Sequence, residues 1–210
     1  MKSLLTVEQF IENRAQYFLV DVRSPGEYAQ AHIPGAVNIP IFSDEERALV
    51  GTTYWKEGTD RAKLVGLSLV GPRLPQMVAE MLEKAAGKDI VLYCWRGGMR
   101  SGSVFSVMEA LGYPARQLVG GYKAFRRHVV RYLKNAKIKA PVFVLNGLTG
   151  VGKTLVIHQL ANEGIPTLDL EKLANHRGSA FGAIGLGQPR SQKDFEAHLY
   201  FALRKVEDAP

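Results

Sequence analysis

The segment DIVLYCWRGGMRS, residues 89–101, joins a near-continuous apolar run to a glycine-rich loop. The run DIVLYC is typical of a strand that is buried on both faces of a parallel sheet. From Gly98 to Leu111 the pattern predicts a loop that leads into a helix. Because ligands bind beyond the carboxyl ends of parallel strands, Cys94 stands where a functional site is expected.

Similar apolar runs recur on both sides of this segment and predict further strands. These runs are YFLVDVR (17–23), HIPGAVNIP (32–40) and RQLV (116–119). Helices are predicted between them. They occupy 6–14, 27–31 and 75–86. Residues 43–75 have no clean period and predict no element. Strands alternating with helices indicate an α/β fold with a parallel sheet.

Cys94 is the one cysteine of the chain, and its surroundings indicate an anion site. Three glycines and two arginines follow it, so backbone N–H groups and positive charge can converge on one point. Such a ring would stabilise the thiolate, which is the nucleophilic form of cysteine. The alternative is a buried core thiol, but such a thiol does not require glycines and arginines directly after it. The site consists of catalytic Cys94 with Arg96, Gly97, Gly98, Arg100 and Ser101.

A second motif, GLTGVGKT at 147–154, lies between the apolar run PVFVLNG, a predicted strand, and LVIHQLANEG, a predicted helix. G-x-x-x-x-G-K-T in this context is the phosphate-binding P-loop. Its amides are expected to cradle a diphosphate, Lys153 to reach the outer oxygens, and Thr154 to bind Mg²⁺. The residues assigned to this site are Gly147, Gly150, Gly152, Lys153 and Thr154.

The composition of the 210-residue chain is that of a folded protein, with 46% hydrophobic and 22% charged residues. No apolar run approaches the ~20 residues that span a bilayer. A single cysteine excludes a disulfide framework and a multi-cysteine zinc site. The sequence therefore predicts a cytoplasmic protein with no membrane partner, no resident metal site and no tightly bound cofactor.

The net charge is +7, and the excess is concentrated in residues 123–139, which hold seven Lys and Arg side chains and no acid. Such a cluster suits a nucleic-acid backbone, because each phosphate contact releases counterions. A solvated helix face is the alternative. The candidate contacts are Arg126, Arg127 and Arg131.

These features divide the chain into a first α/β domain at 1–130, a basic linker at 131–140 and a P-loop domain at 141–210. After the P-loop, no apolar strand ends in the acidic residue that P-loop enzymes use to hold a metal ion. We therefore expect the second domain to be the N-terminal part of a P-loop fold, and incomplete.

The blocks DVRSPGEYAQAHIPGAVNIP, YCWRGGMRS and LVGGYKAF resemble the rhodanese domain in order and spacing. The resemblance covers nearly all of residues 1–130 and implies that Cys94 carries sulfur or selenium in a persulfide-type intermediate. It also implies scaffold roles for four residues. These are Asp21, Arg23, Glu27 and His32.

The cysteine loop departs from the usual rhodanese pattern, because Arg100 lies six residues after Cys94 rather than five. Cys-x5-Arg-Ser is the spacing of cysteine phosphatases, and a roomier ring fits a tetrahedral oxyanion. The loop alone therefore leaves a phosphatase and a chalcogen transferase open. Tyr93 stands where such phosphatases usually have histidine.

Four further blocks resemble the tRNA 2-selenouridine synthase family: EGTDRAK, NGLTGVGKT, LDLEKLANHRGSAFG and QPRSQKDFE. This family also has a seven-residue cysteine loop, like residues 94–100 here. The resemblance implies a tRNA partner with wobble 2-thiouridine. It implies geranylation of the sulfur by geranyl diphosphate and replacement of the S-geranyl group by selenium. Selenophosphate, made by a separate enzyme, is the implied selenium donor. Arg177 becomes a further candidate tRNA contact.

Two alternatives stay open. A rhodanese-type sulfurtransferase with a non-functional P-loop would keep its activity in a Lys153→Ala variant. A Cys-x5-Arg phosphatase would turn over a phosphorylated substrate in a Cys94-dependent way.

Overall fold

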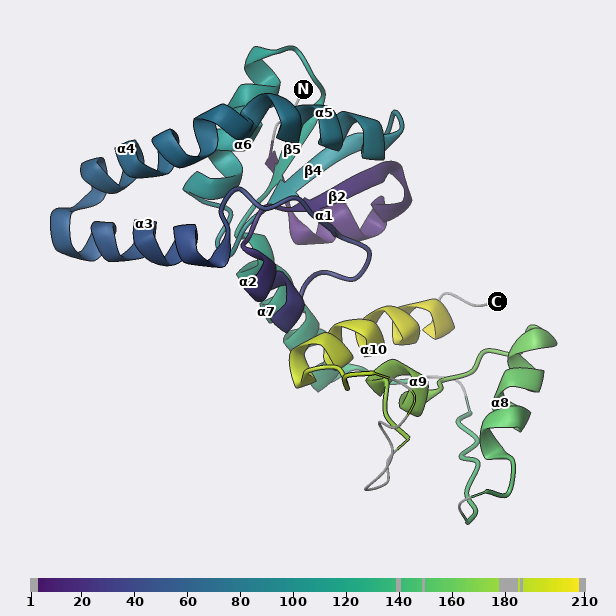
Figure 1. Ribbon diagram of the computed structural model, residues 1–210. Helices are drawn as coiled ribbons and strands as arrows, with labels where there is room; N and C mark the ends of the chain where they lie inside the picture. Colours follow the sequence, from purple (N-terminus) through teal and green to yellow (C-terminus); the bar gives the residue numbers. More distant parts are fainter. Residues whose placement is uncertain (1–3, 139–140, 149, 178–184, 186, 208–210) are drawn as a thin grey trace. The chain divides into compact units, whose positions relative to one another are not determined.

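The computed structural model of the protein describes residues 4–138, 141–148, 150–177, 185 and 187–207 (Figure 1). The chain forms two compact units, Met1–Arg127 and His128–Pro210. Helix α7 (Gly121–Asn135) begins in the first unit and ends in the second. Residues 131–135, part of the segment predicted as a linker, are therefore helical.

The first unit is built around a five-stranded sheet with the order β1-β5-β4-β2-β3, in which all neighbouring strands are parallel. Its strands are β1 (Leu4–Leu5), β2 (Tyr17–Asp21), β3 (Val37–Asn38), β4 (Asp89–Tyr93) and β5 (Ala115–Leu118). The predicted parallel α/β fold is confirmed, and only β1 has no counterpart among the predicted strands.

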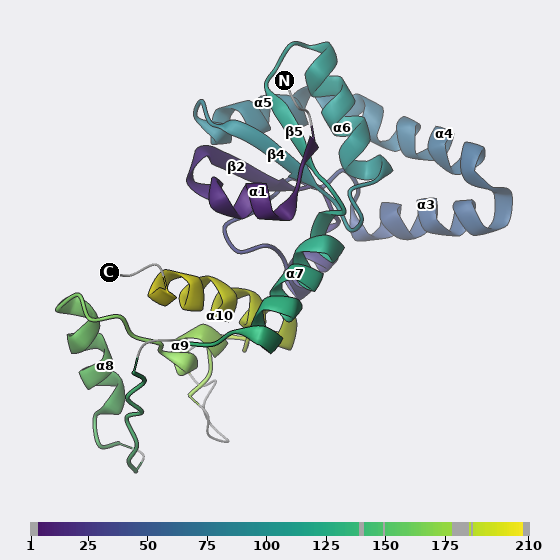
Figure 2. The same cartoon turned by 180° about the vertical axis from the view of Figure 1, so that it is seen from behind.

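Helices supply the crossover connections that parallel neighbours need (Figures 1 and 2). They are α1 (Val7–Glu12), α2 (Pro25–Gln30), α3 (Asp44–Glu57), α4 (Thr59–Val70), α5 (Leu74–Ala85) and α6 (Met99–Ala110). Short 3₁₀ turns occupy Arg14–Gln16 and Gly71–Arg73. The helices predicted over 6–14, 27–31 and 75–86 and after Gly98 are all present.

Side chains alternate between the two faces of the sheet, and this separates Cys94 from the residue before it. Ile90, Leu92 and Cys94 belong to one buried core, together with apolar residues of α5 and α6. Tyr93 is fully buried on the opposite face. The cysteine therefore faces α5 and α6, whereas the tyrosine does not.

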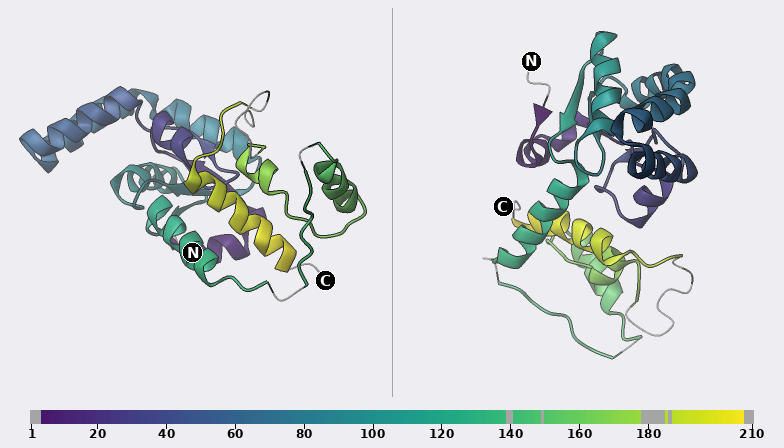
Figure 3. Two further views of the ribbon diagram at one scale, coloured as in Figure 1. Left: turned by 90° about the horizontal axis from the view of Figure 1, so that it is seen from below. Right: turned by 90° about the vertical axis from the view of Figure 1, so that its left-hand side faces the viewer.

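Residues 43–75, for which the sequence predicts no element, form α3 and α4, which lie side by side (Figures 1 and 3). The Ser43 hydroxyl accepts a hydrogen bond from the N–H of Glu46, whose carboxylate accepts one from the N–H of Ser43. This capping box is a local signal that a search for periodicity misses. Gly58 turns the chain between the helices with a φ of +89°, a conformation that favours glycine. Thr53 is the one buried residue of α3, and a mostly exposed helix needs no apolar period.

The second unit contains the end of α7 with α8 (Lys153–Asn162), α9 (Leu170–Ala174) and α10 (Gln192–Glu207). Tyr200 of α10 is fully buried, and its ring centroid lies 4.8 Å from that of Tyr132 on α7. His128 Nε2 lies 3.1 Å from the Tyr200 hydroxyl. These contacts pack α10 against the last turns of α7 (Figure 3). None of the described helices is both long and apolar enough to cross a lipid bilayer.

The strand predicted over PVFVLNG is wrong, because residues 141–148 have no regular secondary structure. Phe143 is 91% exposed. A central parallel strand needs neighbours that pair with its backbone and cover its faces. The described residues between 128 and 207 form no strand that could do so. The helix predicted after the P-loop is present as α8.

Candidate functional site

Cys94 lies directly after β4, and its side chain is only 3% exposed. The Ser101 hydroxyl, in the first turn of α6, donates a hydrogen bond to Cys94 Sγ at 3.3 Å. The Gln117 side-chain nitrogen on β5 donates to that hydroxyl at 2.9 Å, so the Ser101 proton is left for Cys94 Sγ or for the Gly98 carbonyl oxygen, which lies 3.4 Å away. Donation to Sγ is the polarity with which a hydroxyl binds a thiolate. The sequence predicts Ser101, whereas no motif marks Gln117.

Three backbone N–H groups of the cysteine loop have no acceptor in the described chain, and their binding of an anion stays a prediction. The N–H groups of Arg96, Gly97 and Gly98 donate no hydrogen bond to any described part of the chain. Helix α6 begins one residue later, at Met99. Free amides beside a helix N-terminus form a surface that binds an oxyanion.

The glycine pair after β5 lets the start of α7 approach the cysteine loop. The N–H of Tyr122 donates to the Cys94 carbonyl oxygen at 2.9 Å. Gly121 has a φ of +54°, and a Cβ atom there would lie 2.2 Å from the Cys94 carbonyl oxygen and 2.5 Å from the Gly97 nitrogen. Only glycine fits at position 121, which explains the second glycine of LVGGYK.

The two arginines of the loop have different surroundings. Arg100 Nη1 donates to Glu27 Oε2 at 2.5 Å, and its Nη2 donates to Oε1 at 3.4 Å. Burial raises the pKa of Glu27, but the hydrogen bonds and charge of Arg100 outweigh this and hold that pKa below its ordinary value. Arg96 is exposed. Arg100 thus ties the cysteine loop to α2, and its role in anion binding stays a prediction.

Asp21 and Arg23 form an ion pair that is almost completely buried, with 2.6 Å between Arg23 Nη2 and Asp21 Oδ2. Burial by itself lowers the pKa of Arg23, but the hydrogen bonds and charge of Asp21 raise it above its ordinary value. Arg23 also donates to the Ala31 carbonyl oxygen at 2.8 Å. The pair therefore joins the end of β2 to the end of α2, in line with a scaffold role.

Tyr93 and His32 also belong to this scaffold. The Tyr93 hydroxyl accepts a hydrogen bond from the N–H of Ile33 at 3.2 Å. Burial and the negative charge of Asp21 raise the pKa of Tyr93 well above its ordinary value, so it is a poor proton donor for reactions at Cys94. The His32 ring stacks on Tyr28 with 3.9 Å between centroids, and its Nδ1 lies 3.0 Å from the Tyr28 carbonyl oxygen.

The P-loop is a tight turn at the start of α8. Gly150 and Gly152 have φ values of +87° and +85°, which glycine adopts most readily. Lys153 Nζ donates to the carbonyl oxygens of Gly147 at 2.9 Å and Leu148 at 2.8 Å, so its charge lies over the loop. Thr154 is exposed in the first turn of α8. The described part of the chain contains no cluster of three or more His, Cys, Asp or Glu side chains that could hold a metal, and Mg²⁺ at Thr154 stays a prediction.

Of the four predicted nucleic-acid contacts, three are exposed and one is half-buried. Arg127 and Arg131 are exposed and lie four residues apart on α7, as do Lys123 and Arg127, so all three share one helix face. Arg126 is half-buried and lies off that face. Arg177 is exposed after α9.

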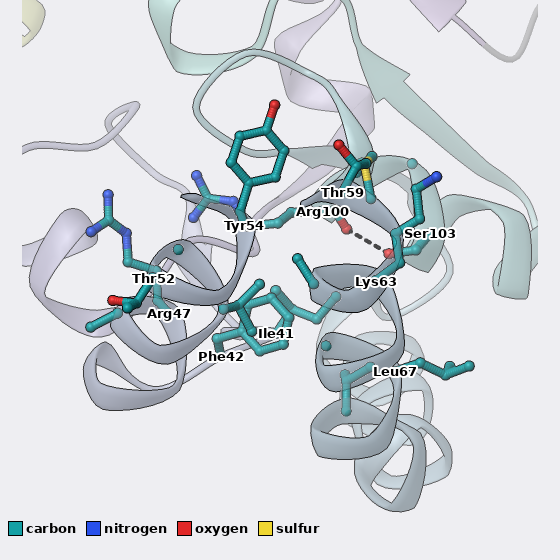
Figure 4. Close-up of a pocket in the computed structure, with 18 of the residues that line it drawn as sticks. Ile41, Phe42, Arg47, Thr52, Tyr54, Thr59, Lys63, Leu67, Arg100 and Ser103 are labelled. Carbon is teal, nitrogen blue, oxygen red and sulfur yellow. Dashed lines mark hydrogen bonds between the residues drawn. The ribbon is translucent and has the colours of Figure 1, made fainter. Parts of the chain in front are cut away.

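A cavity of about 1060 Å³, which the sequence does not reveal, lies between α3, α4 and α6 in the first unit (Figure 4). Apolar side chains, among them Ile41, Phe42 and Leu67, line much of it. Arg47 and Lys63 lie among the polar residues of its wall. The cavity depends on the two helices that the sequence does not predict, and so it could not be anticipated.

A model of the rhodanese-like domain matches residues 6–128, more than half of the chain. The chain belongs to the rhodanese-like family. Its rhodanese-like unit is similar to the crystal structure of the N-terminal domain of a Clostridium difficile 630 protein, with 39% identity and a TM-score of 0.59. That similarity covers 61% of this chain and 99% of the other.

The region after the rhodanese-like unit, residues 140–210, matches a model described as the tRNA 2-selenouridine synthase AAA domain. Relatives named tRNA 2-selenouridine synthase match almost the whole chain. The Nitrosomonas europaea protein is 42% identical over 90% of this chain and 49% of its own length. The Pseudomonas syringae pv. syringae protein is 41% identical over 91% of this chain and 51% of its own. The chain thus spans about half the length of these relatives and combines the two domain types predicted from its sequence.

Proposed function

We propose that this chain forms the rhodanese-like and P-loop portion of a tRNA 2-selenouridine synthase, which replaces sulfur by selenium in wobble 2-thiouridine. One combination carries the proposal. Cys94, with the Ser101 hydroxyl 3.3 Å from its sulfur, lies in a rhodanese-like loop, and a region that matches the AAA domain of these synthases follows in the same chain.

The proposed reaction has two steps. In the first, the thiocarbonyl sulfur attacks carbon 1 of geranyl diphosphate, a C–S bond forms, and diphosphate leaves. In the second, the Cys94 thiolate attacks carbon 2 of the base and expels the S-geranyl group as a thiolate. Selenium of selenophosphate then displaces the cysteine sulfur from that carbon, and water cleaves the Se–P bond to release phosphate. Alkylation is needed because a thiocarbonyl sulfur is a poor leaving group.

The two predicted sites suit these two anionic substrates. The P-loop amides and Lys153 bind the diphosphate of the geranyl donor, and Mg²⁺ at Thr154 would neutralise part of its charge when bound. The free amides after Cys94 suit selenophosphate, which is a tetrahedral oxyanion. Cys94 is the chalcogen-reactive nucleophile, and the basic face of α7 with Arg177 contacts tRNA. A selenophosphate-producing enzyme is the partner that supplies the donor.

Nucleoside mass spectrometry tests the proposal directly. tRNA containing 2-thiouridine is incubated with the chain, geranyl diphosphate and selenophosphate, and in parallel with a C-terminally extended chain of the relatives' length. We expect a mass shift for selenium in place of sulfur that is lost in Cys94→Ala and kept in Glu109→Ala, an exposed position near the end of α6. Lys153→Ala should abolish the S-geranyl product.

Three results would contradict the proposal. Selenium incorporation that survives Cys94→Ala would remove the cysteine from the reaction. Sulfur transfer from thiosulfate that is insensitive to Lys153→Ala, without selenium incorporation by either chain, would indicate a plain sulfurtransferase. Cys94-dependent release of phosphate from a phosphorylated substrate, again without selenium incorporation, would indicate a phosphatase.

A further inference from the structure

The cavity between α3, α4 and α6 lies on the same side of the sheet as Cys94. Ile41, Phe42 and Val70 line the cavity and belong to the same buried core cluster as the cysteine. The cavity is therefore continuous with the packing around Cys94, on the face away from Tyr93.

The cavity also reaches the residues that hold the cysteine loop. Met99 and Arg100 of the first turn of α6 line it, and so does Gln117. The Gln117 side chain donates hydrogen bonds to the Ser101 hydroxyl and to the carbonyl oxygen of Gly97. One side chain thus contacts both the cavity and the group that binds Cys94 Sγ.

The lining is unusually apolar for an exposed part of a protein. Four large apolar or aromatic side chains of the lining are more than half exposed, which is typical of a binding surface. They are Tyr54 (51%), Trp55 (86%), Leu67 (60%) and Met99 (62%). The volume, about 1060 Å³, lies just above the range of about 300–1,000 Å³ for small-molecule sites.

We infer that this cavity binds the ten-carbon isoprenoid chain of the S-geranyl-2-thiouridine intermediate while its base lies at the cysteine loop. The inference rests on the proposed function, which requires a branched hydrocarbon next to the reacting sulfur. The apolar wall takes the chain out of water, and burial of hydrocarbon is the main source of affinity in such sites. A dry position for the S-geranyl group beside the loop orients the carbon that Cys94 attacks.

Charged groups of the wall fit a ligand with one apolar and one anionic end. Arg47 and Arg100 both contact Glu27, at 3.8 Å and 2.5 Å, and Lys63 contacts Asp60 at 3.0 Å. Two carboxylates thus face three cations, so this wall keeps a net positive charge beside its apolar part. Its exposed cations, such as Arg47 with 55% of its side chain accessible, can meet the phosphates of a nucleic acid.

Binding of two nucleosides to the whole chain tests the inference by equilibrium dialysis. The probes are S-geranyl-2-thiouridine and S-methyl-2-thiouridine, which share the alkylated sulfur and differ only in the alkyl group. We expect the geranyl compound to bind at least about tenfold more tightly, because its chain is buried. Ala48→Trp, at an exposed position of the lining on α3, should remove most of this preference. Leu49→Trp, at an exposed position next to it and outside the lining, should keep the preference.

Ser106→Trp fills the cavity from α6 and repeats the test if Ala48→Trp does not fold, as judged by circular dichroism. Equal affinity for the two nucleosides, or a preference that survives both tryptophan variants, would overturn the inference. Geranyl diphosphate is added as a competitor. If geranyl diphosphate competes with the nucleoside and Ala48→Trp abolishes this competition, the cavity also binds the geranyl donor. If geranyl diphosphate does not compete, the cavity binds only the intermediate.

The outcomes separate this inference from the proposed function. If selenium incorporation depends on Cys94 but is unchanged in Ala48→Trp, the isoprenoid role of the cavity is refuted and the proposed function stands. If Ala48→Trp removes the preference for the geranyl nucleoside but the extended chain incorporates no selenium, the proposed function is refuted. The cavity is then still an isoprenoid-binding site.

Discussion

Replacement of Gly121 by alanine tests how the start of α7 holds the cysteine loop. Any L-residue with a φ of +54° bears a cost of about 1–2 kcal/mol. The added Cβ would also lie 2.2 Å from the Cys94 carbonyl oxygen, so the helix must move away from the loop. This movement removes the bonds from the N–H groups of Tyr122 and Lys123 to the carbonyl oxygens of Cys94 and Trp95, both 2.9 Å long. At about 0.5–1.5 kcal/mol each, their loss brings the total destabilisation to about 2–5 kcal/mol.

Gly112→Ala is the matched control, because Gly112 has a φ of +76° and a Cβ atom added there would meet no atom within 4 Å. It bears the backbone cost alone, about 1–2 kcal/mol. Urea denaturation followed by tryptophan fluorescence measures both variants, since Trp95 and Trp55 are the two tryptophans and both lie in the first unit. Equal destabilisation by the two variants, with unchanged alkylation of Cys94, would refute the argument that close approach requires this glycine.

Three further predictions concern charged groups. Asp21→Asn leaves the Arg23 cation buried without its partner and should cost about 3–5 kcal/mol in urea denaturation, whereas Asp60→Asn in an exposed pair should cost less than about 1 kcal/mol. The pKa of Glu27 is lowered by Arg100, so this pair stabilises the fold above the ordinary pKa of 4.5 and loses its effect as the pH falls through the lowered value. Glu27→Gln should therefore be less stable at neutral pH and show a shallower loss of stability in acid; parallel curves for the two proteins would contradict this. Arg127→Glu with Arg131→Glu should reduce the slope of log K for tRNA against log salt concentration by about 1–2, and an unchanged slope would remove this helix face from the tRNA site.

The sheet could be predicted because its strands carry their own signal. The runs YFLVDVR, DIVLYC and RQLV are short and are followed by turn residues, and the structure has a parallel strand in each of them, as predicted. The same rule failed at PVFVLNG. An apolar run forms a strand only where neighbouring strands pair with it, and the described residues of the second unit supply none.

Helix α3 could not be predicted from periodicity, because Thr53 is its one buried residue. Helix α4 does bury one stripe, Ala62, Gly66 and Val70, but two of these three residues are small and give only a weak apolar period. The capping box at Ser43 and the turn glycine at position 58 were visible in the sequence, but two boundary signals do not define what lies between them. The cavity, which carries the inference about the isoprenoid chain, is therefore the part of the site that only three-dimensional structure reveals.

Arg100 shows why spacing alone cannot settle the chemistry of the cysteine loop. It lies six residues after Cys94, as in phosphatases that direct the arginine at the substrate oxyanion. Here the guanidinium makes two hydrogen bonds to Glu27, and we expect the backbone amides and the Ser101 hydroxyl to contact whatever binds at the sulfur. A phosphatase would need Arg100 to leave Glu27 at each turnover, whereas a transferase that binds selenophosphate through amides would not. Glu27→Gln discriminates between these cases, because freeing Arg100 should raise phosphatase activity but should leave selenium incorporation unchanged or lower it through a looser loop.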